Sequence, residues 1–120
     1  MNLTFYSVDS NDEKVVYNTP FVRDENQIIF LDKSLSNTTI YLTFLENSLL
    51  FERKGDIEMS LPLEMGKKTH CHYKNELGLE FDFLVLTNEL LISSKRIEME
   101  YSLFLEGDNI STHKITILFH

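Results

Sequence analysis

The sequence has few of the residues that mark a secreted or disulfide-stabilised protein. Its 120 residues include one cysteine, two prolines and no tryptophan. A single cysteine cannot form an intramolecular disulfide, whereas small secreted domains usually carry an even number of cysteines. The first residues, MNLTFYSVDSNDEK, contain no basic segment followed by an apolar run, so a signal peptide is not expected. We therefore expect a cytoplasmic protein.

Long apolar runs and basic patches are missing as well. No segment approaches the roughly 20 apolar residues that a membrane-spanning helix needs. The chain carries 19 acidic and 11 basic side chains, a formal net charge of −8, with no basic tail or stripe. A protein that binds the phosphates of nucleic acid or an anionic membrane needs such a patch. We therefore expect neither nucleic acid nor a membrane as a partner.

Alternation of apolar and polar residues runs through most of the chain. In DIEMSLPL, residues 56–63, every second residue from Ile57 to Leu63 is apolar, and residues 39–44, 79–86, 96–106 and 113–119 alternate in the same way. This period is typical of half-buried strands. The four glycines lie at short joints between these runs, where glycine permits the backbone angles of hairpin turns. Short joints indicate antiparallel neighbours.

From about residue 38 onward the pattern predicts an up-and-down meander. Residues 2–8, 14–18 and 26–32 indicate further strands, joined by SNDE and TPFVRDE, although ENQIIF and TNELLISS could each hold a helical turn. So many short strands indicate a barrel or a sandwich, and a barrel is favoured because closure leaves no exposed edge. We predict one all-β domain over residues 1–120, a single antiparallel barrel of about eight to ten strands. Pro62 cannot donate to a ladder, so we expect it at a strand end, bulge or edge.

Residues 49–119 carry a series of motifs in a consistent order. They are the R-x-G-D-x-x-M pattern in LLFERKGDIEM, a tyrosine and a glycine in CHYKNELGLEFD, a threonine in VLTNE, and the final run IEMEYSLFLEGDNISTHKITILF. In these motifs the segment resembles the YwiB-like family, small bacterial proteins of unknown function with a calycin-like β-barrel. The segment IIFLDKSLSNTTIY departs from that family, which has a longer insertion there. The resemblance implies a barrel shaped like those of lipocalins and fatty-acid-binding proteins, and it implies no activity.

The stretch THCHY, residues 69–73, brings together side chains that could bind a metal. On a strand, His70 and His72 share one face while Cys71 and Tyr73 share the other. The three candidate ligands therefore cannot converge on one ion. Because the following run, residues 79–83, is apolar at alternate positions, we expect Cys71 and Tyr73 to face the core and the histidines to face solvent. A buried cysteine of this kind behaves as a small hydrophobic side chain.

The same alternation carries four polar side chains toward the interior, namely Arg53, Tyr73, Tyr101 and His113. An interior polar group without a hydrogen bond destabilises a protein by roughly 1–3 kcal/mol. The four could satisfy one another, Arg53 and His113 could instead lie at strand ends in water, or the set could recognise a ligand. An apolar pocket with a few polar groups is the usual form of a small-molecule site. We predict these four as the ligand-binding residues.

Signals for catalysis are weak. The acidic pairs Glu98 and Glu100, and Glu80 and Asp82, fall on the expected outer faces. The chain contains no G-x-S-x-G, no glycine-rich phosphate loop, no H-E-x-x-H and no C-x-x-C. We predict no catalytic residues, no metal and no cofactor. The enzymatic alternative is a metal-dependent hydrolase that uses the two histidines of THCHY.

Two functions remain in view. The first is a cytoplasmic barrel that binds a small apolar or amphipathic molecule, with its apolar part against Phe and Leu side chains and its polar end on Arg53 or a tyrosine. The second is a filled barrel that serves as a protein-interaction module or a homodimer. It draws on apolar residues expected on outer faces, which are Tyr41, Leu50, Leu84, Leu86, Phe104 and Leu118.

Overall fold

The computed structural model describes all residues from 1 to 120 and contains ten strands and no helix. The strands are β1 (Asn2–Asp9), β2 (Lys14–Asp24), β3 (Gln27–Leu31), β4 (Thr38–Phe44), β5 (Leu49–Gly55), β6 (Glu58–Leu63), β7 (Lys68–Lys74), β8 (Glu80–Ile92), β9 (Arg96–Leu105) and β10 (Asp108–Phe119). No helix of the structure has the length and apolarity needed to cross a membrane. The predicted all-β class is confirmed.

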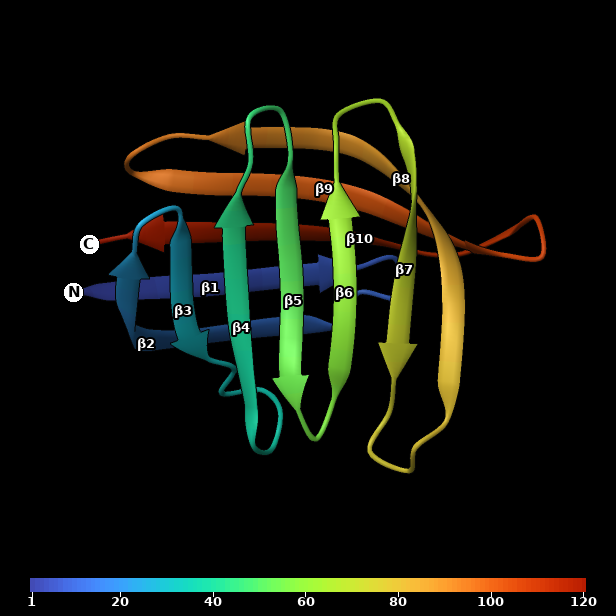
Figure 1. Ribbon diagram of the computed structural model, residues 1–120, viewed down its shortest axis with the longest axis horizontal. Helices are drawn as coiled ribbons and strands as arrows, with labels where there is room; N and C mark the ends of the chain where they lie inside the picture. The colour runs from blue at the N-terminus through green and yellow to red at the C-terminus, as the bar shows by residue number, and fades with distance from the viewer.

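The ten strands close into one antiparallel barrel. Each strand pairs with its neighbours in sequence, and β1 pairs with β10 to complete the circle. In Figure 1, β4–β7 cross in front of β9, β10 and β1, and the long strand β8 bends from the front layer into the back layer. Successive turns alternate between two ends of the barrel, so five turns lie at the end away from the chain termini. We call this end the open end, because the cavity of the barrel opens there, and we call the other end the closed end.

Alternation along the strands determines which side chains fill the barrel. At the closed end the inner-face residues are apolar and fully buried, and they come from seven different strands: Leu3, Ile28, Leu42, Leu49, Leu63, Ile97 and Ile117. Burying each such side chain contributes roughly 1.5–3 kcal/mol relative to leaving it exposed. The closed end is thus the packed core that holds the barrel together.

Gly55 shows why a glycine stands at one of the joints. It has a φ of +137°, and a Cβ at this position would lie 1.8 Å from the carbonyl oxygen of Asn37. That oxygen accepts a hydrogen bond from the backbone N–H of Asp56 at 3.2 Å. The β3–β4 loop therefore packs directly on the β5–β6 turn, and only glycine leaves room for this contact.

Pro62 lies where its missing N–H is not needed. The β6–β7 ladder pairs only residues 58–60 with residues 72–74, and beyond it Pro62 pairs on the β5 side alone, with Leu50. Its carbonyl accepts a hydrogen bond from the Thr69 hydroxyl at 2.6 Å. The prediction that Pro62 occupies an edge-like position is confirmed.

Three expectations about individual segments are wrong. The segment TPFVRDE is not a joint, because β2 continues to Asp24, and Pro20 stands where pairing with β1 ends and pairing with β3 begins. Neither suspected helical turn forms, and TNELLISS instead holds a bulge at Asn88 within β8. Leu79 lies outside β8 and is 55% exposed, so it does not anchor the core. The first two errors fall where pairing with neighbouring strands overrides the local pattern, and the third falls in the β7–β8 turn, where the strand period has not yet begun.

Candidate functional site

The half of the barrel toward the open end is hollow. It holds a cavity of about 720 Å³ lined by 19 residues, of which 13 are hydrophobic. Small-molecule sites typically measure about 300–1,000 Å³ and are mostly apolar. The hydrophobic lining is formed by Leu35, Ile57, Met59, Leu61, Cys71, Tyr73, Phe81, Phe83, Tyr101, Leu103, Leu105, Ile110 and Ile115. Phe81, Leu105 and Ile110 are also partly exposed, so the rim of the cavity is apolar as well.

All four polar residues expected in the interior line this cavity. Arg53, Met59, Tyr73 and Phe81 stand in register across β5, β6, β7 and β8, so they form one row of the wall. Tyr101 and His113 form a second row on β9 and β10, with their rings stacked at a centroid distance of 5.1 Å. The alternation of side chains along each strand is what directs these groups inward.

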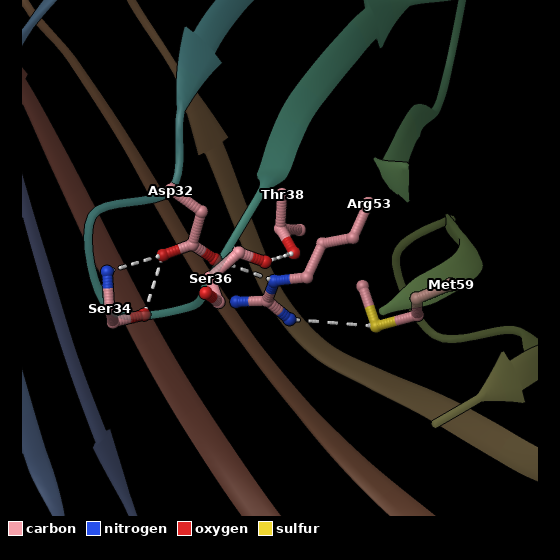
Figure 2. A network of polar contacts seen from close by, with 6 residues as sticks. All are labelled: Asp32, Ser34, Ser36, Thr38, Arg53 and Met59. Carbon is pink, nitrogen blue, oxygen red and sulfur yellow. Dashed lines mark hydrogen bonds and ion pairs between the residues drawn. The ribbon is translucent and has the colours of Figure 1, made fainter. Parts of the chain in front are cut away.

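Arg53 does not face water at a turn, because it is held by a buried carboxylate. Its Nε donates to Asp32 Oδ2 at 2.9 Å, and Asp32 has no exposed side-chain surface while the Arg53 side chain is 17% exposed. Figure 2 shows the rest of the network, in which Asp32 Oδ1 accepts hydrogen bonds from the backbone and hydroxyl of Ser34. Arg53 Nη1 lies 3.6 Å from the Met59 sulfur. The guanidinium is thereby neutralised within the wall.

A second polar group lies beside this pair. The Tyr17 hydroxyl is buried without a hydrogen-bond partner. Burial and the nearby Asp32 carboxylate both raise the pKa of Tyr17 above its usual value, so it stays a neutral donor. The Asp32 carboxylate already accepts three hydrogen bonds, from Ser34 and Arg53, so Tyr17 and Arg53 both lie beside a carboxylate whose partners are in place.

The second row of the wall is uncharged near neutral pH. Burial is the main cause that lowers the pKa of His113, with the Arg53 charge acting in the same direction and Asp9 opposing it. The Nε2 atom of His113 lies 2.9 Å from the Ser111 hydroxyl oxygen. Burial raises the pKa of Tyr101 to about 12. This side of the cavity therefore offers hydrogen-bonding groups and ring faces but no charge.

The THCHY segment is arranged as the alternation predicts. Cys71 is 2% exposed and lines the cavity, and burial raises the pKa of its thiol to about 11. His70 and His72 face solvent. His72 lies 2.9 Å from Asp82 and 3.3 Å from Glu80, and its pKa is raised, chiefly by the hydrogen bond to Asp82. No group of three or more His, Cys, Asp or Glu side chains is placed to hold a metal ion.

Three residues in or beside the site, Asp32, Tyr17 and Glu13, were not predicted from the sequence. Asp32 follows Ile28 and Phe30 at intervals of two, so alternation alone would have placed it inside. Tyr17 is likewise spaced by two from buried Thr19. Glu13 lines the cavity from the β1–β2 turn, and turns do not follow the strand period, so no signal in the sequence points to it.

Comparison with known proteins agrees with this fold. No curated protein matches the chain. Among solved structures, the crystal structure of the ywiB protein from Bacillus subtilis is similar, with a TM-score of 0.68 and 18% sequence identity over 99% of this chain and 90% of that one. The family described as a domain of unknown function (DUF1934) matches residues 7–117, which extends well before the motifs of residues 49–119. The chain belongs to this YwiB-like family of unknown function.

Proposed function

We propose that this barrel is a cytoplasmic binding protein for a small apolar or amphipathic molecule, which it takes into the hollow half. The observation that carries the proposal is the cavity of about 720 Å³, bounded by apolar side chains and a few polar groups. Transfer of an apolar group from water to such a lining contributes about 25 cal/mol per Å² of apolar surface that is buried. The packed closed end supplies the rigid frame.

Four residues would orient the ligand. Arg53 and Tyr73 lie on one wall of the cavity and Tyr101 and His113 on another, so they border a ligand from two sides and can meet any polar group that it carries past the opening. The location in the cytoplasm is supported by the single buried cysteine and the absence of a disulfide. No catalytic role is proposed for any of these residues.

The experiment uses N-phenyl-1-naphthylamine, a neutral apolar dye whose fluorescence rises in apolar surroundings. Leu103 lines the cavity on β9, whereas Leu118 lies on the outer face of β10 and is 39% exposed. We expect the dye to bind with a micromolar Kd, Leu103→Trp to weaken binding about tenfold or more by filling the cavity, and Leu118→Trp to leave it within about twofold. Ser111→Phe is a second filling variant, in case Leu103→Trp does not fold.

Two results would end the proposal. One is a dye affinity that is the same in the filling variants and in the wild type, because binding would then lie outside the barrel. The other is the absence of dye binding together with native mass spectra that show no small molecule retained by the purified protein. Circular dichroism of each variant checks that the barrel is intact.

The alternative of an interaction module is favoured less, because a filled barrel needs no hollow half. Its expected outer-face residues Tyr41, Leu50, Leu84, Leu86, Phe104 and Leu118 are all partly exposed, and a homodimer stays a prediction. Sedimentation that gives only monomer at tens of micromolar would count against it.

A further inference from the structure

The charge of the cavity indicates which kind of ligand it accepts. This inference rests on the proposed function and deepens it. Among the lining residues only Glu13 and Arg53 carry full charges near neutral pH. Arg53 is neutralised by Asp32, whose carboxylate is fully buried and fixed by three hydrogen bonds, whereas the Glu13 side chain makes no ion pair. The wall therefore presents a neutral interior and one free carboxylate.

Arg53 is a poor anchor for an acidic head group. A ligand carboxylate that approached the guanidinium would lie beside the buried carboxylate of Asp32, and two like charges so close repel each other. Displacing Asp32 would strand a buried carboxylate and break its bonds to Ser34, which is costly. A ligand with an anionic end therefore finds the position beside Arg53 already occupied by the Asp32 carboxylate.

The turns around the opening also carry a net negative charge. Apart from Asp32, whose charge is balanced by Arg53, the five turns at the open end contain one base, Lys33, and five acids, which are Asp12, Glu13, Asp56, Glu76 and Glu106, for a sum of −4. The four turns at the closed end contain two bases, Lys67 and Lys95, and three acids, Glu25, Glu46 and Glu64, for a sum of −1. A cleft of one sign attracts ligands of the opposite sign and slows the entry of like charges.

The cavity walls also suit a cation. Tyr73, Phe81 and Phe83 form a continuous aromatic strip, with ring centroids 6.3 Å apart for the first pair and 6.2 Å for the second. Phe81 is 39% exposed at the rim. Ring faces attract ammonium groups, and aromatic sites recognise quaternary ammonium ligands by this means. The strip combines apolar surface for a tail with ring faces for a positive head.

We propose that the cavity selects cationic amphiphiles. The apolar tail enters the hollow half between Leu61, Leu103 and Ile115, and the ammonium head stays at the opening, which Glu13 lines from the β1–β2 turn and Phe81 lines from β8. The interior Arg53–Asp32 pair stays intact and provides hydrogen-bond donors without a net charge.

The test compares three probes with the same ten-carbon chain, which are decyltrimethylammonium, 1-decanol and decanoate, each used below its aggregation threshold. Each probe displaces N-phenyl-1-naphthylamine from the wild-type protein at pH 7.5. We expect decyltrimethylammonium to bind most tightly, decanol less tightly and decanoate least. At 20 mM salt the Kd values of the two charged probes should differ about tenfold or more. The gap should narrow at 300 mM salt because exposed charges are then screened.

Two variants with the same change of charge test whether the preference for a cationic probe arises at the open end. Glu13→Lys lies at the open end, whereas Glu46→Lys lies in the β4–β5 turn at the closed end. We expect Glu13→Lys to raise the Kd for decyltrimethylammonium about fivefold or more. Glu46→Lys should change that Kd less than about twofold. Decanol binding should stay constant in both, which shows that the cavity itself is intact.

The outcomes separate this inference from the proposed function. If decanoate binds most tightly and loses affinity in Arg53→Ala, the barrel is a binding protein and the inference of a cationic ligand is wrong. Equal affinities for the three head groups would refute it in the same way. If neither the dye nor any ten-carbon probe binds, the proposed function fails and this inference fails with it.

Discussion

The buried pair of Asp32 and Arg53 gives the sharpest test of the structure, through the substitution Asp32→Asn. The change removes the negative charge while keeping the size of the side chain. The oxygen that accepts hydrogen bonds from Ser34 can be retained, but the partner of Arg53 Nε is replaced by an amide group. The result is a guanidinium, 17% exposed in the native protein, that has lost its counter-charge.

The expected magnitude follows from this burial. Removing one partner of a buried ion pair typically costs about 3–5 kcal/mol of unfolding free energy. Arg53 borders an open cavity, so water can partly solvate the stranded charge, and we expect the lower end of the range, about 3 kcal/mol. With a urea m-value of about 2 kcal/mol per molar, the midpoint of unfolding falls by about 1.5 M.

Urea unfolding followed by far-ultraviolet circular dichroism measures this shift. The control is Glu64→Gln, which breaks the ion pair between Glu64 and Lys67. The Lys67 side chain is 66% exposed, so this variant should lose less than about 1 kcal/mol of unfolding free energy. The double variant Asp32→Asn with Arg53→Met should recover about 1 kcal/mol or more relative to the sum of the single changes, because no stranded charge remains. A loss in Asp32→Asn as small as that of the control would refute the buried pair.

Three further results are expected. Gly55→Ala should lower the unfolding free energy by about 2 kcal/mol or more, because the new Cβ would collide with the Asn37 carbonyl. Gly107→Ala, where a Cβ would meet open space, should lower it by about 1 kcal/mol. Equal urea midpoints for the two variants would contradict this. Because the pKa of His113 in the folded state lies below 6.5, the fold disfavours its protonation, so stability is lost as the pH falls below about 6.5. His113→Gln should make that loss less steep between pH 7.5 and 5.5, and unchanged urea midpoints across that range would count against it. The Cys71 thiol, with a pKa of about 11, should react with iodoacetamide at pH 8 about 100-fold more slowly than free cysteine, and a rate near that of free cysteine would place it outside the core.

The inner faces of the barrel could be predicted because a strand has a period of two. That rule placed Arg53, Tyr73, Tyr101 and His113 on the inner face, and the structure finds all four along one cavity. It also placed the two histidines of THCHY outside, where they are exposed. The number of strands, about eight to ten, agreed with the ten observed because glycine and polar joints divide the later part of the chain cleanly.

The partner of Arg53 could not be predicted from local pattern. Asp32 lies 21 residues earlier, and the two meet only because β4 and β5 form a hairpin that brings the β3–β4 loop against the end of β5. Alternation places Asp32 inside but does not identify its partner, and neither the path of the rest of the loop nor the position of Glu13 in another turn could be read from alternation. The pairing of the strands on either side of each turn decides both.

Whether the barrel is filled or hollow was also beyond the sequence, because it depends on volumes summed over ten strands. One half is filled and the other is hollow: seven aliphatic residues fill the closed end, and the open end keeps about 720 Å³. A sealed, dry cavity of that volume would cost about 17 kcal/mol at about 24 cal/mol per Å³, which exceeds the net stability of a typical domain, about 5–15 kcal/mol. The cavity is therefore compatible with a stable fold only because solvent or a ligand can enter past the exposed rim formed by Phe81, Leu105 and Ile110. Under the proposed function, an apolar ligand that displaces water from this lining would stabilise the folded state through its binding free energy.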